Sequence, residues 1–208
     1  MRLFKRGNEC PNCHARLEKV PKGKAKCPHC GKPIYVRGGK LFTEYDVNTQ
    51  DWLARLGCVS VTQKDFDRTR EARAKKFGFQ PSVNDVVWGI LNKIVIAAKD
   101  LPPAKCFERC EQAHRVMAQL VASEGKNPNP YIADALRDSL TRMELEGVKK
   151  VMVFCGGYQT DGTFSSATCD ACKALHRKVF PIEKALAELP VPTVCTSEFG
   201  CRCRYEPA

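Results

Sequence analysis

Two pairs of cysteines near the start of the chain have the residue types and spacing of a metal site. They are Cys10-Pro-Asn-Cys13 and Cys27-Pro-His-Cys30. Each pair places two sulfurs at one tight turn, and two such turns facing each other complete the tetrahedral shell that zinc prefers. Four thiolates leave no position for water, so we expect a structural zinc. His14 and His29 adjoin the pairs and could replace a ligand, but because four cysteines suffice we expect both to face solvent.

A second cysteine cluster lies near the other end of the chain. Its two pairs are Cys169-Asp-Ala-Cys172 and Cys201-Arg-Cys203, and the further candidate ligands are Cys195, His176 and Cys155. Two sulfurs from each pair would again make a compact tetrahedral clip, so we expect a second zinc ion here. The competing interpretation is a group of buried thiols that binds no metal.

A third set of metal-binding residue types lies in the middle of the chain. Cys106, Cys110 and His114 are spaced by four, which places them on one face of one helix. A straight helix spreads them along about 12 Å of its axis, too far for one ion to touch all three. We therefore expect these residues to pack in the core.

The positive charge of the chain is concentrated at its N-terminal end. The formal net charge is +11, and residues 1–40 hold eleven lysines and arginines against only Glu9 and Glu18. The cations expected to contact nucleic-acid phosphates are Arg16, Lys19, Lys22, Lys24, Lys26 and Lys32, with Lys5, Arg6, Arg37 and Lys40 nearby. The alternative is a solvated surface that keeps the module soluble.

Signatures of common enzymes are missing from the sequence. It has no nucleophile elbow, no His-Glu-x-x-His, no kinase signature and no His-x-Glu ahead of a Pro-Cys-x-x-Cys. Gly156-Gly157 lacks the Lys-Ser/Thr that follows a phosphate loop, so we interpret it as a turn. The remaining catalytic alternative is a zinc-dependent hydrolase in which His176 contacts an open-sided metal at the C-terminal site.

The cysteine-rich ends flank a middle region with helical periodicity. Apolar residues recur at three and four, and capping residues, glycines and prolines mark the ends. The expected helices cover Asp46–Leu56, Thr62–Phe77, Ser82–Leu101, Pro103–Glu124 and Tyr131–Glu146. The second is charged, with a thin apolar stripe of chiefly Phe66 and Phe77. The short connections predict antiparallel neighbours in a bundle.

Short strands are expected at both ends. Ala15–Val20 and Lys32–Val36 would form a zinc ribbon, while Val148–Phe154 would begin a two-stranded hairpin over 148–166. The expected fold class is mainly α with small zinc-stabilised modules. Its domains would be a basic zinc ribbon at 1–45, a helical bundle at 46–147, and a hairpin with a Cys-rich zinc-binding module at 148–208.

The cysteine count bears on the compartment. Thirteen cysteines could suggest disulfides, but the count is odd and the pairs have metal-ligand spacing. The basic N-terminus leads into no apolar run of signal-peptide length, and no stretch approaches about eighteen consecutive apolar residues. We expect a cytoplasmic protein with reduced thiols and no membrane partner.

Two C-terminal segments resemble a known family. The run Thr168–Pro181, with its Cys-x-x-Cys-x-x-Leu and Val-Phe, and the later Cys201-Arg-Cys203 are similar to the C-terminal cysteine motif of the phage Mu F-type minor head proteins. The resemblance implies a phage or prophage origin and a part in head assembly or DNA packaging. It implies host cytoplasm or virion as the location and no enzymatic activity from the motif itself.

Three functions follow from these patterns. The first is a non-catalytic zinc-binding protein that binds nucleic acid, or a nucleoprotein or assembly partner, through its basic ribbon. The second is a structural protein of virion head assembly, and the third is the zinc-dependent hydrolase. The absence of enzyme signatures favours the first two.

Overall fold

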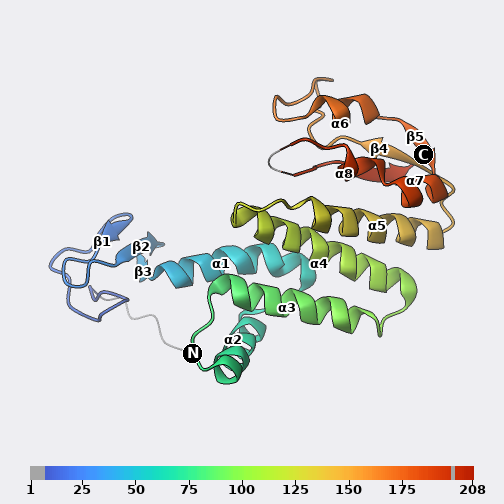
Figure 1. The fold of residues 1–208 in the computed structure, drawn as a ribbon. Helices are drawn as coiled ribbons and strands as arrows, with labels where there is room; N and C mark the ends of the chain where they lie inside the picture. Colours follow the sequence, from blue (N-terminus) through green and yellow to red (C-terminus); the bar gives the residue numbers. More distant parts are fainter. Residues whose placement is uncertain (1–7, 198–199) are drawn as a thin grey trace. The chain divides into compact units, whose positions relative to one another are not determined.

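The structure is a computed structural model that describes residues 8–197 and 200–208. The chain divides into two compact units, Met1–Val87 and Trp88–Ala208. Helices predominate, and two small three-stranded sheets accompany them (Figure 1). Within the described residues, none of the helices combines the length and apolar character needed to span a lipid bilayer.

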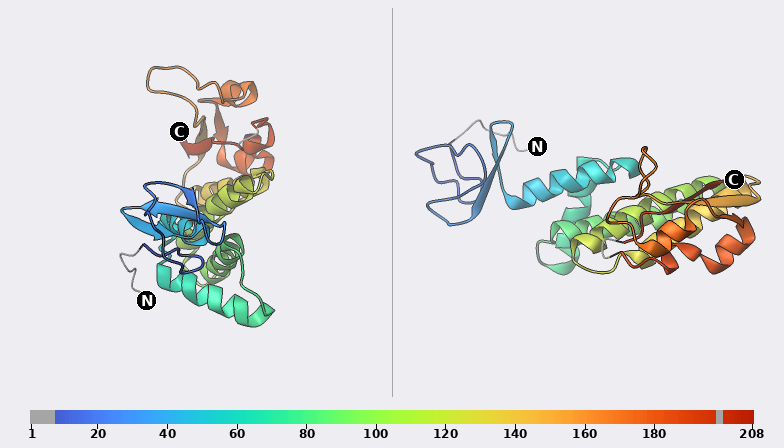
Figure 2. Two further views of the ribbon diagram at one scale, coloured as in Figure 1. Left: turned by 90° about the vertical axis from the view of Figure 1, so that its left-hand side faces the viewer. Right: turned by 90° about the horizontal axis from the view of Figure 1, so that it is seen from above.

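The first unit begins with a small antiparallel sheet. Its strands are β1 (Ala25–Lys26), β2 (Pro33–Arg37) and β3 (Lys40–Phe42), and Figure 2 shows the sheet leading into the first helix. The strand expected at Lys32–Val36 is therefore present as β2. The segment Ala15–Val20 is not a strand, because its only pairing is an isolated bridge between Glu9 and Arg16.

This sheet has a very small core. Among the described residues, the buried cluster that adjoins it consists of Cys10, Leu17, Cys27 and Ile34, so two of the four are cysteines. A module of this size rarely remains folded on apolar burial alone and needs a metal or disulfides. The sulfur atoms therefore lie in the core, where a bound metal ion would stabilise the module.

Two capped helices complete the first unit. They are α1 (Glu44–Leu56), followed by the short 3₁₀ turn η1 (Gly57–Val59), and α2 (Gln63–Phe77). Thr62 and Asp65 form a capping box at the start of α2, and Gly78 ends it with a φ of 76°. The capping box marks the start and Gly78 the end of the helix predicted over Thr62–Phe77, so its predicted bounds are confirmed.

Helix α3 (Val83–Ala98) crosses the boundary between the units, and α4 (Pro103–Ser123) and α5 (Asn129–Leu145) follow it. Helices α4 and α5 pack against each other as an antiparallel pair. Leu120, Leu136 and Leu140 are fully buried. The helices expected at Pro103–Glu124 and Tyr131–Glu146 are thus present within two residues at each end.

The C-terminal sheet is organised around β4 (Lys150–Phe154). Its order is β5–β4–β6, with β5 at Val179–Pro181 and β6 at Arg204–Pro207, both antiparallel to β4. The short helices are α6 (Asp170–Leu175), α7 (Ile182–Glu188) and α8 (Pro190–Thr193). Helices α7 and α8 and strand β6 lie against α5 (Figure 1), which joins the sheet to the helical pair in one core.

The hairpin predicted over 148–166 is wrong. Strand β4 is present, but later segments of the chain hydrogen-bond to both of its edges. In the segment after β4, the only local pairing is an isolated bridge between Tyr158 and Phe164. Val151 and Val153 are fully buried, as suits the central strand of a sheet rather than one arm of an exposed hairpin.

Candidate metal centres

The four N-terminal cysteines meet at one point. Their sulfur atoms all lie within 4.8 Å of one another. The Sγ atoms of Cys10 and Cys30 are 3.9 Å apart, and those of Cys13 and Cys27 are 3.8 Å apart. A tetrahedral zinc with Zn–S bonds of about 2.3 Å requires sulfurs roughly 3.8 Å apart. The observed spacing therefore fits such an ion.

The backbone around the two pairs repeats the same turn. The N–H of His14 donates to the carbonyl of Cys10, and that of Gly31 donates to the carbonyl of Cys27, each at 2.9 Å. His14 and Gly31 both have a left-handed φ, at 61° and 71°. Each Cys-x-x-Cys thus closes one turn that directs its two sulfurs to the same side.

Backbone N–H groups are aimed at the sulfurs. Asn12 N donates to the Sγ of Cys10 and His29 N to the Sγ of Cys27, each at 3.4 Å. Desolvation favours the neutral thiol of Cys27, but hydrogen bonds from the N–H groups of Cys30 and His29, together with those from the Cys10 and Cys30 side chains, lower the pKa of Cys27 to about 6. These donors stabilise a thiolate, the form of cysteine that binds metal.

The two adjoining histidines lie outside this sulfur group. The Nε2 of His29 lies 3.1 Å from the carbonyl oxygen of Arg16, and the side chain of His14 is exposed. Among the residues that the structure describes, the group consists of the four sulfurs, and four sulfurs on one ion leave no position for water as a ligand.

The C-terminal cysteines form two overlapping groups. Cys169, Cys172 and Cys195 lie within 4.8 Å of one another, and so do Cys172, Cys201 and Cys203. Cys172 belongs to both. The sulfurs of Cys169 and Cys195 are 3.9 Å apart, as are those of Cys172 and Cys201.

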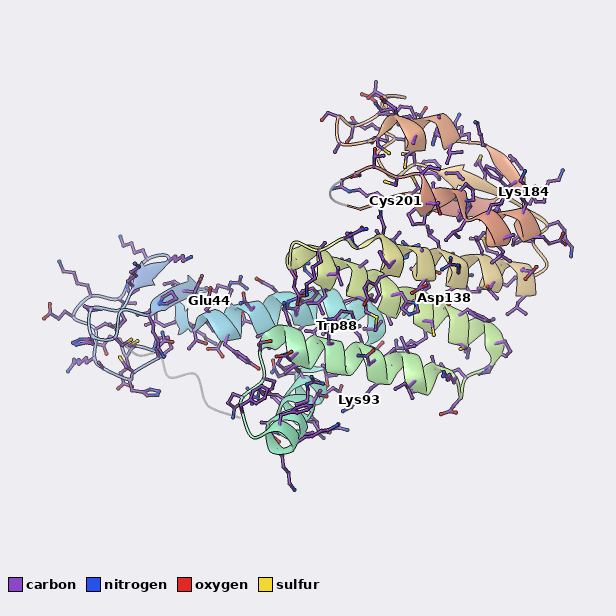
Figure 3. The ribbon with its side chains drawn as sticks, viewed as in Figure 1. Glu44, Trp88, Lys93, Asp138, Lys184 and Cys201 are labelled. Carbon is purple, nitrogen blue, oxygen red and sulfur yellow. The ribbon has the colours of Figure 1, made fainter. Side chains whose placement is uncertain are left out.

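Three separate segments supply these thiols. Cys169 precedes α6 and Cys172 lies within it, and Cys195 follows α8. Cys201, labelled in Figure 3, and Cys203 lie on the segment leading into β6. The two predicted pairs are therefore brought together, and Cys195 joins them. Five thiols are one more than a tetrahedral ion needs, and among the described residues Cys172 is the one that both groups share.

A small cavity adjoins the C-terminal thiols. Its volume is about 20 Å³, and the cysteines that line it are Cys155, Cys169, Cys172, Cys195 and Cys203. Cys155 is buried but belongs to neither sulfur group. A space of this size holds about one water-sized particle.

His176 occupies an aromatic cluster instead of a sulfur group. Its Nδ1 accepts a hydrogen bond from Cys155 N at 3.2 Å, and its ring centroid lies 4.3 Å from that of Tyr158. Burial, with Arg177 as a second cause, lowers the pKa of His176. A neutral imidazole with Nδ1 engaged in this way orients the loop after β4.

Gly156 and Gly157 have a packing role that the sequence did not indicate. A Cβ at Gly156 would lie 2.2 Å from the carbonyl oxygen of Arg202, and one at Gly157 would lie 1.8 Å from Oγ1 of Thr168. These glycines let the loop after β4 approach the segments that carry the cysteines. They serve close packing rather than phosphate binding.

Substitution at Gly156 tests this packing. We expect Gly156→Ala to lower the free energy of unfolding by roughly 1–3 kcal/mol, because a backbone oxygen cannot move aside as a flexible side chain can. The matched control is Gly23→Ala, where a Cβ meets nothing within 4 Å. Denaturant unfolding of both variants checks the difference, and equal stability would contradict the packing role.

The mid-chain residues lie apart from these groups. His114 Nδ1 is 2.7 Å from Oδ2 of Asp138, labelled in Figure 3, so this pair links α4 to α5. Cys110 is buried, and its burial raises the pKa of its thiol to about 11, with Asp138 adding to the effect. Neither Cys106, Cys110 nor His114 belongs to a metal-sized group among the described residues.

The predicted phosphate-binding cations are all exposed. They are Arg16, Lys19, Lys22, Lys24, Lys26 and Lys32. Within the part of the chain that the structure describes, none of the six forms an ion pair, whereas Arg37 pairs with Asp51 at 2.8 Å. Lys19 and Lys26 border a hollow of about 410 Å³ whose lining includes Leu17 and Ile34. Lys5 and Arg6 lie outside the described residues.

The fold and sites define a mainly helical chain with two small sheets and two cysteine clusters that could bind metal. No known protein family, curated protein or solved structure matches it.

Proposed function

We propose that this chain is a non-catalytic zinc protein whose N-terminal module, a zinc ribbon, binds the phosphates of nucleic acid. One observation carries the proposal. Two turns with the same backbone hydrogen bonds bring the sulfurs of Cys10, Cys13, Cys27 and Cys30 to the spacing of a tetrahedral ion, on a module whose six cations are exposed and unpaired among the described residues.

The ligand chemistry favours zinc. Soft thiolate ligands in a tetrahedral arrangement suit Zn²⁺, whereas Mg²⁺ and Ca²⁺ require oxygen ligands in larger shells. The same chemistry applies to the C-terminal thiols, so the proposal includes a second zinc. A shell of four sulfurs leaves no site for a bound water, and the hydrolase alternative requires one.

The distribution of charge supports a polyanionic partner. Residues 1–40 carry a formal charge of +9, from eleven basic and two acidic residues. Six of these cations, Arg16, Lys19, Lys22, Lys24, Lys26 and Lys32, are exposed and form no ion pair within the described residues, so no acidic partner has to be displaced from them. Binding to phosphates would release condensed counterions, so affinity should fall steeply with salt.

Neutralising three lysines tests the proposal. In the variant Lys22→Gln/Lys24→Gln/Lys26→Gln, we expect weaker binding to a DNA duplex and a shallower dependence of log affinity on log salt. The slope should fall by up to about 2.7 if each lysine contacts one phosphate. Fluorescence anisotropy at several salt concentrations measures both quantities.

A control variant with three lysines replaced elsewhere distinguishes the effect of lysine position from that of net charge. Lys93, Lys99 and Lys105 are also exposed, and their replacement by glutamine removes the same charge from the second unit. The proposal predicts little effect of this control on affinity or slope. If both triples weaken binding equally, or if the protein binds no duplex at low salt, the ribbon is not the binding surface.

A structural part in virion head assembly is the second candidate. The two segments that resemble the phage Mu F-type motif lie far apart in the sequence, yet their cysteines meet around Cys172. If the two segments form one motif, their cysteines should bind the same metal ion, and this arrangement would allow them to do so. Detection of the protein in purified virions would favour this function, and its absence from them would argue against it.

A further inference from the structure

Two phenylalanines at the end of α2 are exposed. Phe77 is 47% exposed and Phe79 is 63% exposed, and their ring centroids are 6.1 Å apart. The sequence pattern had placed Phe77 on the same apolar stripe as Phe66, but Phe66 is fully buried while Phe77 turns to solvent. The left-handed Gly78 between the two phenylalanines ends the helix and brings both rings to one place.

Two cations lie over one ring of this aromatic pair. The guanidinium of Arg73 lies 5.4 Å from the centroid of the Phe77 ring, and Nζ of Lys76 lies 5.3 Å from it. Lys75, which precedes Lys76 in the chain, is exposed. Within the described residues, Arg73, Lys75 and Lys76 form no ion pair with an acidic side chain. The surface therefore combines flat apolar rings with positive charge that is available to an anion.

The occupant that fits both properties is a single-stranded nucleic acid. Its bases have π faces that stack on aromatic rings, and its phosphates pair with the adjacent cations. The paired bases of a duplex are stacked on each other and cannot offer their faces to these rings. A purely apolar partner would leave the cations without counter-charges, and a simple anion would leave the rings in water.

We propose that Phe77 and Phe79, with Arg73, Lys75 and Lys76, form a stacking site for single-stranded nucleic acid. This inference rests on the proposed function in taking nucleic acid as the partner. It goes further by naming the strand form and a second surface, separate from the ribbon lysines. The ribbon binds phosphates of either form, and the end of α2 selects unpaired bases.

The test uses the full-length, metal-loaded protein and two labelled probes, oligo-dT and a DNA duplex of equal length. The variant Phe77→Ala/Phe79→Ala should bind oligo-dT roughly tenfold or more weakly, since each stacked base contributes about 1–3 kcal/mol. Its affinity for the duplex should stay within about twofold of wild type. Because both side chains are exposed, the variant should remain folded, which circular dichroism checks.

Two more variants identify the interaction. Phe77→Tyr/Phe79→Tyr retains the aromatic faces and should retain oligo-dT affinity. Phe77→Leu/Phe79→Leu keeps apolar surface without π faces and should lose as much affinity as the alanine variant. Ile96→Ala/Leu145→Ala, which removes exposed apolar side chains elsewhere, should have no effect.

The outcomes separate this inference from the proposed function. If the alanine or leucine variant binds oligo-dT as wild type does, the stacking site is wrong even when the ribbon lysines control duplex binding. In the leucine case, the surface would suit an apolar protein segment instead. If the alanine and leucine variants bind oligo-dT more weakly while the triple lysine variant of the ribbon binds normally, the stacking site is supported and the ribbon proposal is wrong. A wild-type protein that binds neither probe would overturn both.

Discussion

We expect that replacing Cys27 by Ser will remove one equivalent of the proposed zinc and unfold the N-terminal module. Cys27 is 2% exposed and belongs to the cluster of four buried residues that the structure describes in that module. Structural zinc contributes an apparent binding free energy of about 10–16 kcal/mol to small domains, so little remains to hold the ribbon once its shell is broken. Metal analysis will measure the lost ion. Trypsin should then cut rapidly within the lysine-rich segment 19–26.

The control for this experiment is Cys58→Ser. Cys58 is exposed and lies outside both sulfur clusters, so its replacement should leave zinc content and tryptic resistance unchanged. A Cys27→Ser protein that keeps its full zinc content and is cut no faster than wild type would show that the four sulfurs hold no structural ion.

The second large effect is expected from Cys172→Ser. Cys172 is 3% exposed and is the one cysteine common to both C-terminal groups among the described residues. Its loss should release the second zinc and lower the stability of the core that contains Val151, Cys203 and Tyr205. We expect a loss of several kcal/mol, because binding energy for a structural ion is also folding energy. Zinc content and thermal unfolding measure the two effects.

Comparison of single cysteine variants will identify which thiols are ligands of the proposed C-terminal zinc. Five thiols are available for four positions, so among Cys169→Ser, Cys195→Ser, Cys201→Ser and Cys203→Ser we expect three variants to lose the ion as Cys172→Ser does and one to retain it. Cys106→Ser, in the same unit but outside the groups, is the control. Retention of the second zinc by Cys172→Ser would contradict the proposed C-terminal site.

Much of the helical structure was predictable because its signals are local. The box of Thr62 with Asp65 fixes the start of α2, and Ser82 with Asp85 forms a reciprocal pair of hydrogen bonds at the start of α3. Gly78 ends α2 through its left-handed backbone. The N-terminal sulfur group was predictable for the same reason, since each Cys-x-x-Cys makes its own turn.

The features that sequence reasoning missed depend on contacts distant in the chain. Strand β4 was expected to pair with its nearest successor, but it pairs with Val179–Pro181 and Arg204–Pro207, which no local pattern identifies. Cys195 was only a further candidate because its spacing fits no short motif, yet its sulfur reaches that of Cys169. The tight approach of Gly156 to Arg202 likewise exists only in the folded chain.

The central claim is that thiolate-bound zinc fastens both cysteine-rich modules. Native mass spectrometry of the freshly purified, reduced protein tests it most directly, because the mass reports the number of bound ions on the intact fold. We predict two zinc ions per chain, and one in either Cys27→Ser or Cys172→Ser. A folded wild-type chain with no bound metal would contradict the claim.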